Sequence, residues 1–352
     1  MSPARERVSR LLDEVRAEYA PDPRLAVFEV EADVDGDALV LAGATSEPAA
    51  AEALHRGAAS LGAWSVVRDE VARLPDGDRG GAAHAVVTSA VAPMQATPAV
   101  NTTQVSQVVL GDHVTVLRRR GRWLQCRARD GYLGWIHCGY AALLDETDAV
   151  AWEMGTQGEA WISLGAELRD EAGATFARLP WGARVVREAA DRVRLPDGRR
   201  GRPAGELVSA AERPLRFPLR GEAVVATAGR WVGAPYLWGG ITPAGVDCSG
   251  LVQAAYRLHG HLLPRDSDMQ SRVGEEVDPG GFDAFLPGDL LFFAEDPGRC
   301  THVVMSEGGS RIIHSSLGNG GVARNDLLGA LNYERELRRI FLCARRIVGG
   351  AG

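Results

Sequence analysis

The sequence predicts an α+β protein built of several domains, on three observations along the chain. Residues 2–19 place apolar side chains on one helical face, residues 84–210 consist of short β-prone runs broken by glycine and proline, and a helical pattern begins at Cys248 after a glycine-rich loop. A length of 352 residues allows two to four domains with sizeable cores. We therefore expect a modular chain whose chemistry lies in its last third.

Composition and charge exclude several classes of function. The net charge of -7, without a cluster of Lys and Arg, argues against a nucleic-acid partner. The first residues are charged throughout, so we expect no signal peptide, no membrane span and a cytoplasmic protein, with export by another route left open. An odd, scattered set of cysteines favours reduced thiols over a zinc site or a disulfide framework: Cys126, Cys138, Cys248, Cys300 and Cys343.

Residues 1–80 are predicted to form a small α/β module. The pattern indicates a helix over 2–19, two β-prone runs, a second helix beginning near Ser46 with Pro48 in its first turn, and a strand that ends at Leu74. Because the module contains no cluster of reactive side chains, we assign it no catalytic role.

Residues 84–147 and 148–212 are predicted to be two small β-barrels. Gly111-Asp-His-Val-Thr-Val followed by Asp130-Gly-Tyr-Leu-Gly-Trp is echoed further on by Gly182-Ala-Arg-Val-Val and Asp197-Gly-Arg-Arg-Gly-Arg. This pattern resembles bacterial SH3-like domains, which commonly accompany cell-wall hydrolases. A proline-containing linker then leads into a last domain, predicted over residues 218–350.

Cys248 is the predicted nucleophile of that last domain. Leu251, Val252 and Ala255 follow a helical period, which places Cys248 in the first turn with Asp247 as its N-cap. The positive end of a helix dipole favours a thiolate, the form of cysteine that attacks carbonyl carbons. The alternative is a small buried apolar residue, which we expect for the other four cysteines.

His302 and His314 are the predicted partners of this nucleophile. They lie on β-prone runs joined by Glu307-Gly-Gly-Ser, and a hairpin turning about residue 308 would set the two histidines opposite each other on one face. One imidazole could then take the thiol proton while the other orients the first. The alternative is a pair of half-buried strand histidines.

Six sequence blocks in this order over residues 221–348 resemble the NlpC-type cysteine peptidases, papain-like enzymes that cut peptidoglycan stem peptides. The blocks are Tyr236-Leu-Trp-Gly-Gly, Val246-Asp-Cys-Ser-Gly-Leu, Pro264-Arg-Asp-Ser-Asp-Met-Gln, Pro287-Gly-Asp-Leu-Leu-Phe-Phe, Thr301-His-Val-Val-Met and Ile313-His-Ser-Ser. The resemblance implies a papain-like fold and a triad of Cys248, His302 and His314.

The SH3-like segments and the Arg265-Asp-Ser-Asp-Met-Gln block narrow this resemblance to γ-D-glutamyl-L-diamino acid endopeptidases of the dipeptidyl-peptidase VI type. Such enzymes imply a murein peptide with a free N-terminal L-Ala as the substrate, a role in recycling wall fragments, and no metal or organic cofactor. The backbone N–H of Cys248 is the expected oxyanion donor, assisted by Tyr236.

The resemblance also implies substrate-binding residues. Asp266 is similar to the family's amine-binding carboxylate, with a solvated loop acid as the alternative, and Asp247 is as well explained by helix capping. Tyr132 corresponds to a tyrosine with which the first SH3-like module closes the site, with an exposed loop aromatic as the alternative. The complete set is Tyr132, Tyr236, Trp238, Asp247, Ser249, Asp266 and Ser267.

The sequence departs from this family pattern near Gln104, where an acidic residue is expected and an amide is found. An amide lacks a carboxylate's charge, so we expect heavier reliance on Asp266. Three other functions stay open: an amidase or acyltransferase on the same scaffold, a general hydrolase of intact wall, and a wall-binding protein with an inert last domain. The third-position diamino acid and the oligomeric state are not predicted.

Overall fold

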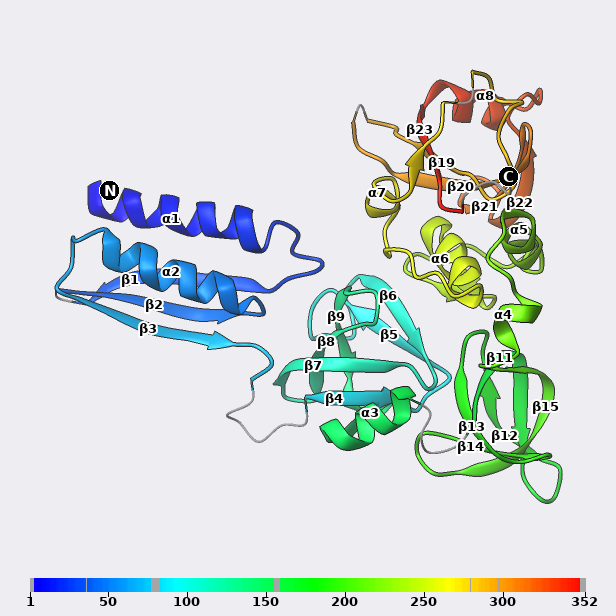
Figure 1. Cartoon of the computed structure of the whole chain (residues 1–352), viewed down its shortest axis with the longest axis horizontal. Helices are drawn as coiled ribbons and strands as arrows, with labels where there is room; N and C mark the ends of the chain where they lie inside the picture. Colours follow the sequence, from blue (N-terminus) through cyan, green and yellow to red (C-terminus); the bar gives the residue numbers. More distant parts are fainter. Residues whose placement is uncertain are drawn as a thin grey trace.

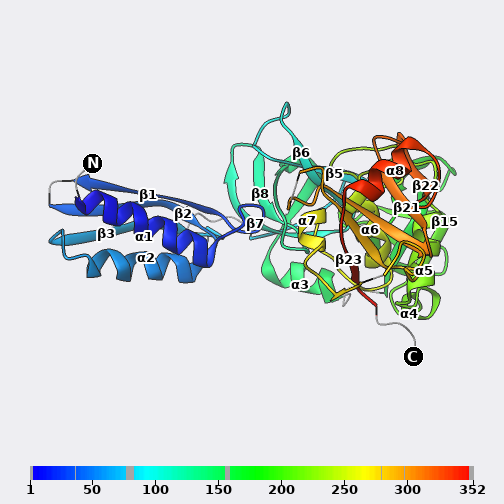
Figure 2. The ribbon, with the colours of Figure 1, turned by 90° about the horizontal axis from the view of Figure 1, so that it is seen from above.

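The protein is an elongated, mixed α+β chain of successive modules (Figures 1 and 2). The N-terminal module extends from one end of the long axis, and the remaining modules cluster at the other end. The predicted domain boundary at residue 80 and the predicted end at residue 350 lie outside the described residues. The computed structural model describes residues 3–35, 37–76, 83–154, 159–278, 280–296 and 298–348.

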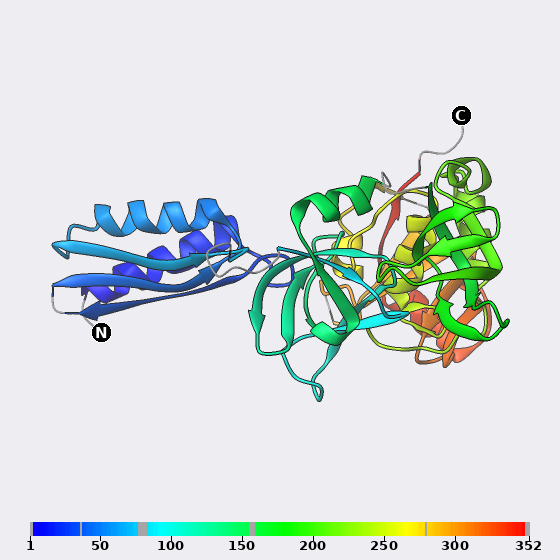
Figure 3. The same cartoon turned by 90° about the horizontal axis from the view of Figure 1, so that it is seen from below.

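In the N-terminal module, two helices pack on one face of a sheet with the strand order β1-β2-β3 (Figures 1 and 3). The second helix begins where the sequence predicts, with Pro48 in its first turn after Glu47. Leu39, Leu41 and Leu54 are fully buried between sheet and helices. The elements are α1 (Pro3–Tyr19), β1 (Phe28–Asp35), β2 (Ala38–Thr45), α2 (Pro48–Ser60) and β3 (Val66–Arg73).

The first SH3-like segment forms a sheet with the strand order β10-β4-β7-β8-β9-β5-β6. After it, α3 (Glu146–Met154) places Trp152 between Val86 and Val186, so this one side chain joins the two SH3-like segments. The strands are β4 (His84–Val87), β5 (Val91–Gln95), β6 (Gln104–Val109), β7 (His113–Arg120), β8 (Trp123–Arg127), β9 (Leu133–His137) and β10 (Ala141–Leu144), with a 3-10 turn η2 (Cys138–Tyr140) before the last.

The second SH3-like segment closes on itself. Strand β11 pairs with β13 and with β15, and β14 joins these two, so the pairings return to their start. The short helix α4 (Arg213–Arg216) follows in the predicted linker. The strands are β11 (Glu159–Arg169), β12 (Thr175–Leu179), β13 (Arg184–Ala189), β14 (Arg192–Arg194) and β15 (Arg200–Ser209).

The last domain is a sheet with the strand order β18-β23-β19-β20-β21-β22 between helices (Figure 1). Val303 and Met305 pack towards α6, whereas Val304 packs on the other face with Leu337 of α8.

The elements of the last domain are α5 (Gly221–Gly229), β16 (Ile241–Thr242), β17 (Gly245–Val246), α6 (Cys248–Leu258), α7 (Ser267–Gln270), β18 (Glu275–Glu276), β19 (Leu290–Phe293), β20 (His302–Gly308), β21 (Arg311–Ser316), β22 (Gly321–Asp326), α8 (Asn332–Arg339) and β23 (Phe341–Arg346).

Helix α6 also contacts the first SH3-like segment. Gln253 donates to the Asp130 carboxylate at 2.8 Å, and Arg257 pairs with Asp112. These bonds hold the β6–β7 and β8–β9 turns of the first SH3-like segment against the helix that carries Cys248. Within the described parts of the chain, no helix is long and apolar enough to cross a bilayer.

Candidate active site

Cys248 is the first residue of α6, as the sequence predicts, and its side chain is buried. The N-cap prediction for Asp247 is confirmed, because its Oδ1 accepts the backbone N–H of Gly250 at 2.7 Å. The backbone N–H of Cys248 donates no hydrogen bond to any described residue, since it belongs to the first turn. That N–H is therefore available to a developing oxyanion.

Burial opposes the effect of the helix dipole, which was expected to favour a thiolate at Cys248. Burial first, and the charge of Asp247 second, raise the pKa of Cys248 to about 12. Backbone N–H groups of Val303 and Ser249 lower the pKa, but they do not offset the burial. A helix terminus contributes at most about 2 kcal/mol even at a partly buried position, so desolvation outweighs the dipole here. The attacking thiolate must be generated by a base.

The predicted base lies on the neighbouring hairpin. Strand β20 sets Met305 opposite Ile313, and the pairing is irregular just before Gly308. A turn about residue 308 would have set His302 directly opposite His314. In the observed register the two histidines are diagonal neighbours instead. Their shared face is confirmed, since His302 Nε2 and His314 Nδ1 are 2.7 Å apart.

Both imidazoles are neutral near pH 7. Burial, together with the charge of His314, lowers the pKa of His302 well below its usual value, and burial lowers the pKa of His314 to about 4. The strand also brings the base to the nucleophile, because Val303, next to His302, directs its backbone N–H at the Cys248 sulfur. The Cys248 thiol therefore lies beside the strand that carries His302.

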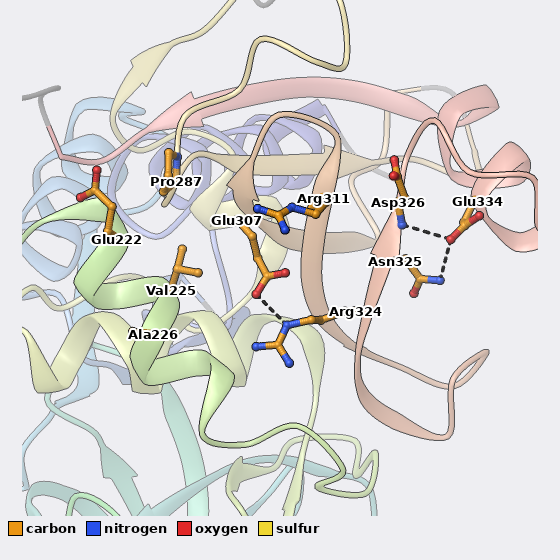
Figure 4. A pocket seen from close by; sticks show the side chains of 10 residues that line it. All are labelled: Glu222, Val225, Ala226, Pro287, Glu307, Arg311, Arg324, Asn325, Asp326 and Glu334. Carbon is orange, nitrogen blue, oxygen red and sulfur yellow. Dashed lines mark hydrogen bonds and ion pairs between the residues drawn. The ribbon is translucent and has the colours of Figure 1, made fainter.

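Asn325 and Glu334 continue the histidine pair, and sequence reasoning missed both (Figure 4). His314 Nε2 lies 3.0 Å from Asn325 Oδ1, and Asn325 Nδ2 donates to Glu334 Oε1 at 3.3 Å. The buried Glu334 carboxylate also accepts the backbone N–H groups of Asp326 and Leu331. Its position in the first turn of α8 signals only a helix start, and nothing local marks Asn325.

This relay fixes the tautomers. A carboxylate only accepts hydrogen bonds, so the Asn325 NH2 group faces Glu334 and its Oδ1 faces His314. When the His314 proton is on Nε2, towards Asn325 Oδ1, His314 Nδ1 accepts from His302 Nε2–H; Asn319 Nδ2 lies 3.2 Å from the same Nε2. The Nδ1 lone pair of His302 is left for the thiol proton. Behind the relay lies a cavity of about 650 Å³ lined by charged side chains such as Glu307, Arg311 and Arg324 (Figure 4).

A buried ion pair ties the nucleophile to the predicted amine site. Asp247 Oδ2 accepts from Arg265 Nη2 at 2.6 Å, and Ser249 Oγ accepts from Arg265 Nη1 at 2.9 Å. Ser106 of the first SH3-like segment accepts from the same guanidinium at 3.0 Å. Asp247 therefore caps α6, the alternative to substrate binding, and both of its carboxylate oxygens already accept hydrogen bonds. No role was predicted for Arg265, which the sequence marks only as part of a motif.

Asp266, next to this ion pair, is joined by the first SH3-like segment. The Tyr132 hydroxyl donates to Asp266 Oδ2 at 2.9 Å, so Tyr132 is not an exposed loop aromatic and Asp266 is not a solvated loop acid. Burial raises the pKa of both groups. Arg24 of the N-terminal module donates to the same oxygen at 2.8 Å. The N-terminal module, to which no catalytic role was assigned, therefore contacts Asp266 through Arg24.

The other predicted residues surround this centre. Burial first, and then the charges of Cys248 and Asp247, raise the pKa of the Tyr236 hydroxyl, whereas Trp238 is 63% exposed. Ser267 is buried at the start of α7. Gln104 donates to the Trp238 carbonyl at 2.9 Å, so the amide binds backbone of the last domain. The substrate-binding roles of these residues stay predictions.

A model of the NlpC/P60 family matches residues 233–338, the segment that holds the cysteine and both histidines. Residues 233–338 form an NlpC/P60 peptidase domain. A model of the bacterial dipeptidyl-peptidase Sh3 domain matches residues 95–138, which include Tyr132. The NlpC/P60 domain is a cysteine peptidase domain, and the predicted SH3-like module precedes it.

Relatives of the NlpC/P60 domain share most of this architecture. The chain is 28% identical over 262 residues to a γ-D-glutamyl-L-lysine dipeptidyl-peptidase of Bacillus subtilis, covering 68% of this chain and 80% of the relative. It is 28% identical to a dipeptidyl-peptidase 6 of Lysinibacillus sphaericus, with 69% and 92% covered. A crystal structure of an NlpC/P60 family protein from Bacillus cereus has a similar fold, with a TM-score of 0.60, 23% identity, and coverage of 75% and 99%.

Proposed function

We propose that this protein is a γ-D-glutamyl-L-diamino acid endopeptidase that cleaves murein stem peptides bearing a free N-terminal L-Ala, in the recycling of wall fragments inside the cell. The observation that carries the proposal is the Tyr132–Asp266 hydrogen bond, which joins a partly buried carboxylate beside the Asp247–Arg265 pair to the SH3-like module. A carboxylate that is partly shielded from water and still reachable suits a substrate ammonium. The dipeptidyl-peptidases among the relatives support the same substrate class.

The proposed chemistry uses the neutral thiol and imidazole. As the Cys248 sulfur attacks the γ-carbonyl carbon of D-Glu, its proton passes to His302 Nδ1, and the oxyanion accepts the N–H of Cys248. His302 then returns the proton to the leaving amine of the diamino acid, which leaves a thioester. Water, deprotonated by the same imidazole, cleaves the thioester and restores the thiol. His314 and Asn325 keep the imidazole in the tautomer that accepts at Nδ1.

The test is product analysis on L-Ala-γ-D-Glu-diamino acid tripeptides and on intact wall, by mass spectrometry. The proposal expects L-Ala-D-Glu and the free diamino acid from the tripeptide, and little release of peptide fragments from intact wall. Cys248→Ala should cleave neither substrate. Release of wall peptides by cleavage at the muramic acid amide would support an amidase instead. Efficient release of fragments from intact wall would support a general hydrolase.

A further inference from the structure

The loop between α1 and β1, residues 20–27, carries Arg24 to the site (Figure 1). Arg24 Nη1 donates to Asp266 Oδ2 at 2.8 Å and to Asp268 Oδ1 at 2.7 Å, and Nη2 donates to Asp268 Oδ2 at 2.8 Å. On its other side, Asp22 of the same loop accepts from Nε and Nη2. The guanidinium is therefore clamped between its own loop and the NlpC/P60 domain.

The loop is held in place independently of this clamp. Leu133, next to Tyr132, donates its backbone N–H to the Arg24 carbonyl at 2.8 Å. A buried apolar cluster joins the N-terminal module to the first SH3-like segment, and Glu29 pairs with Arg118 at 2.6 Å. The cluster consists of Val27, Ala44, Leu74, Leu117 and Leu133. Arg24 thus reaches the site from a built interface.

The two oxygens of Asp266 are used differently. Oδ2 accepts from both Tyr132 and Arg24, whereas Oδ1 accepts no hydrogen bond from any described residue. We propose that Arg24 is a positioning residue for substrate recognition: it holds Asp266 by one oxygen and leaves the other oxygen for the substrate ammonium. This inference rests on the proposed function, and it makes the N-terminal module part of the specificity site.

The chemistry of Arg24 suits this role. Burial raises the pKa of Asp266, while Tyr132, Arg265 and Arg24 all act to lower it, so removing Arg24 should raise that pKa further. All of the guanidinium hydrogen bonds named here go to carboxylates of Asp22, Asp266 and Asp268, in the planar fork geometry that lysine cannot provide. The Arg24 guanidinium is therefore paired with protein carboxylates and is not the group that binds the substrate.

The experiment compares the unmutated full chain with Arg24→Ala, Arg24→Lys and Glu29→Gln on free and N-acetylated tripeptides. We expect Arg24→Ala to raise KM for the free peptide about ten-fold, with kcat within about two-fold and the acetylated peptide unaffected. The acid limb of kcat/KM for the free peptide should move to higher pH, because Asp266 loses a cation that lowers its pKa. Arg24→Lys should restore part of both effects, and Glu29→Gln should show neither.

A second measurement does not depend on turnover. In the full chain with labelled aspartate, the carboxyl ¹³C shift of Asp266 should titrate at higher pH in Arg24→Ala than in the unmutated protein. An unchanged titration would overturn the clamp whatever the substrate is, whereas a shifted titration without tripeptide cleavage would reject only the proposed function. Equal losses on both peptides would show that Arg24 merely docks the module. A lowered KM would show that Arg24 competes with the substrate.

Discussion

Two buried thiols in this protein have the same resting chemistry and different neighbours. Burial raises the pKa of both Cys126 and Cys248 to about 12. Cys126 lies in the core of the first SH3-like segment, whereas Cys248 lies beside the strand that carries His302. Reactivity at Cys248 is therefore a property of the pair and not of the cysteine alone.

This difference predicts the pattern of alkylation. At pH 7, iodoacetamide should label Cys248 and leave Cys126 unmodified in the folded protein, as followed by peptide mass spectrometry. Replacing the base with His302→Ala should slow labelling of Cys248 by about ten-fold or more, because the thiol loses its proton acceptor. Cys248→Ala should abolish turnover. An unchanged labelling rate in His302→Ala would reject the assigned pair.

Two asparagines lie at the same nitrogen of His314, and only one is assigned a role in fixing its tautomer. Asn325 Oδ1 accepts from His314 Nε2, whereas Asn319 donates to that Oδ1 at 2.8 Å. Asn325→Ala should lower kcat by about 10- to 100-fold with KM nearly unchanged, since the productive tautomer is no longer enforced. Asn319→Ala is the matched control and should lower kcat only a few-fold. Equal losses in the two variants would contradict the relay.

Single elements were predictable where local rules determine them. The start of α6 at Cys248 follows from Asp247 and the apolar period, and the start of α2 follows from Pro48. The hairpin was predicted with the right face but the wrong register, because the irregularity before Gly308 leaves no distinct sequence signal. The high pKa of Cys248 was missed since it depends on burial, which the helix pattern does not reveal.

Burial of His314 in the β20–β21 hairpin makes the free energy of unfolding depend on pH. The pKa of His314 is about 4 in the fold and about 6.5 when unfolded, so its contribution to stability is complete above pH 6.5 and is lost as the pH falls towards 4. The loss amounts to about 3 kcal/mol for this group. In urea unfolding at pH 7 and 4.5, His314→Gln should flatten the decline in unfolding free energy. A decline as steep as in the unmutated protein would contradict this.

At the scale of the whole molecule, the candidate site is assembled from distant modules. Tyr132 and Asp266 were each predicted from a family resemblance, but their contact spans 134 residues of sequence. Arg24, 242 residues from Asp266, could not be predicted, because a lone arginine in a loop has no pattern that names its partner. Asn325 and Glu334 were missed for the same reason: their roles exist only once β22 and α8 pack together.

This assembly predicts how strongly a free amine is required. In the unmutated protein, the Tyr132 and Arg24 hydrogen bonds still pair one oxygen of Asp266 when the substrate is N-acetylated, so the penalty is smaller than for a bare buried charge. We expect kcat/KM to favour the free tripeptide over its N-acetylated form by about 10- to 100-fold. Asp266→Asn should narrow that ratio to a few-fold by damaging the free peptide, and Tyr132→Phe should narrow it less, because Arg24 still holds the carboxylate. The ratio is measured for the three proteins under one set of conditions, and comparable rates on both peptides in the unmutated protein would remove the recycling role and favour hydrolysis of intact wall.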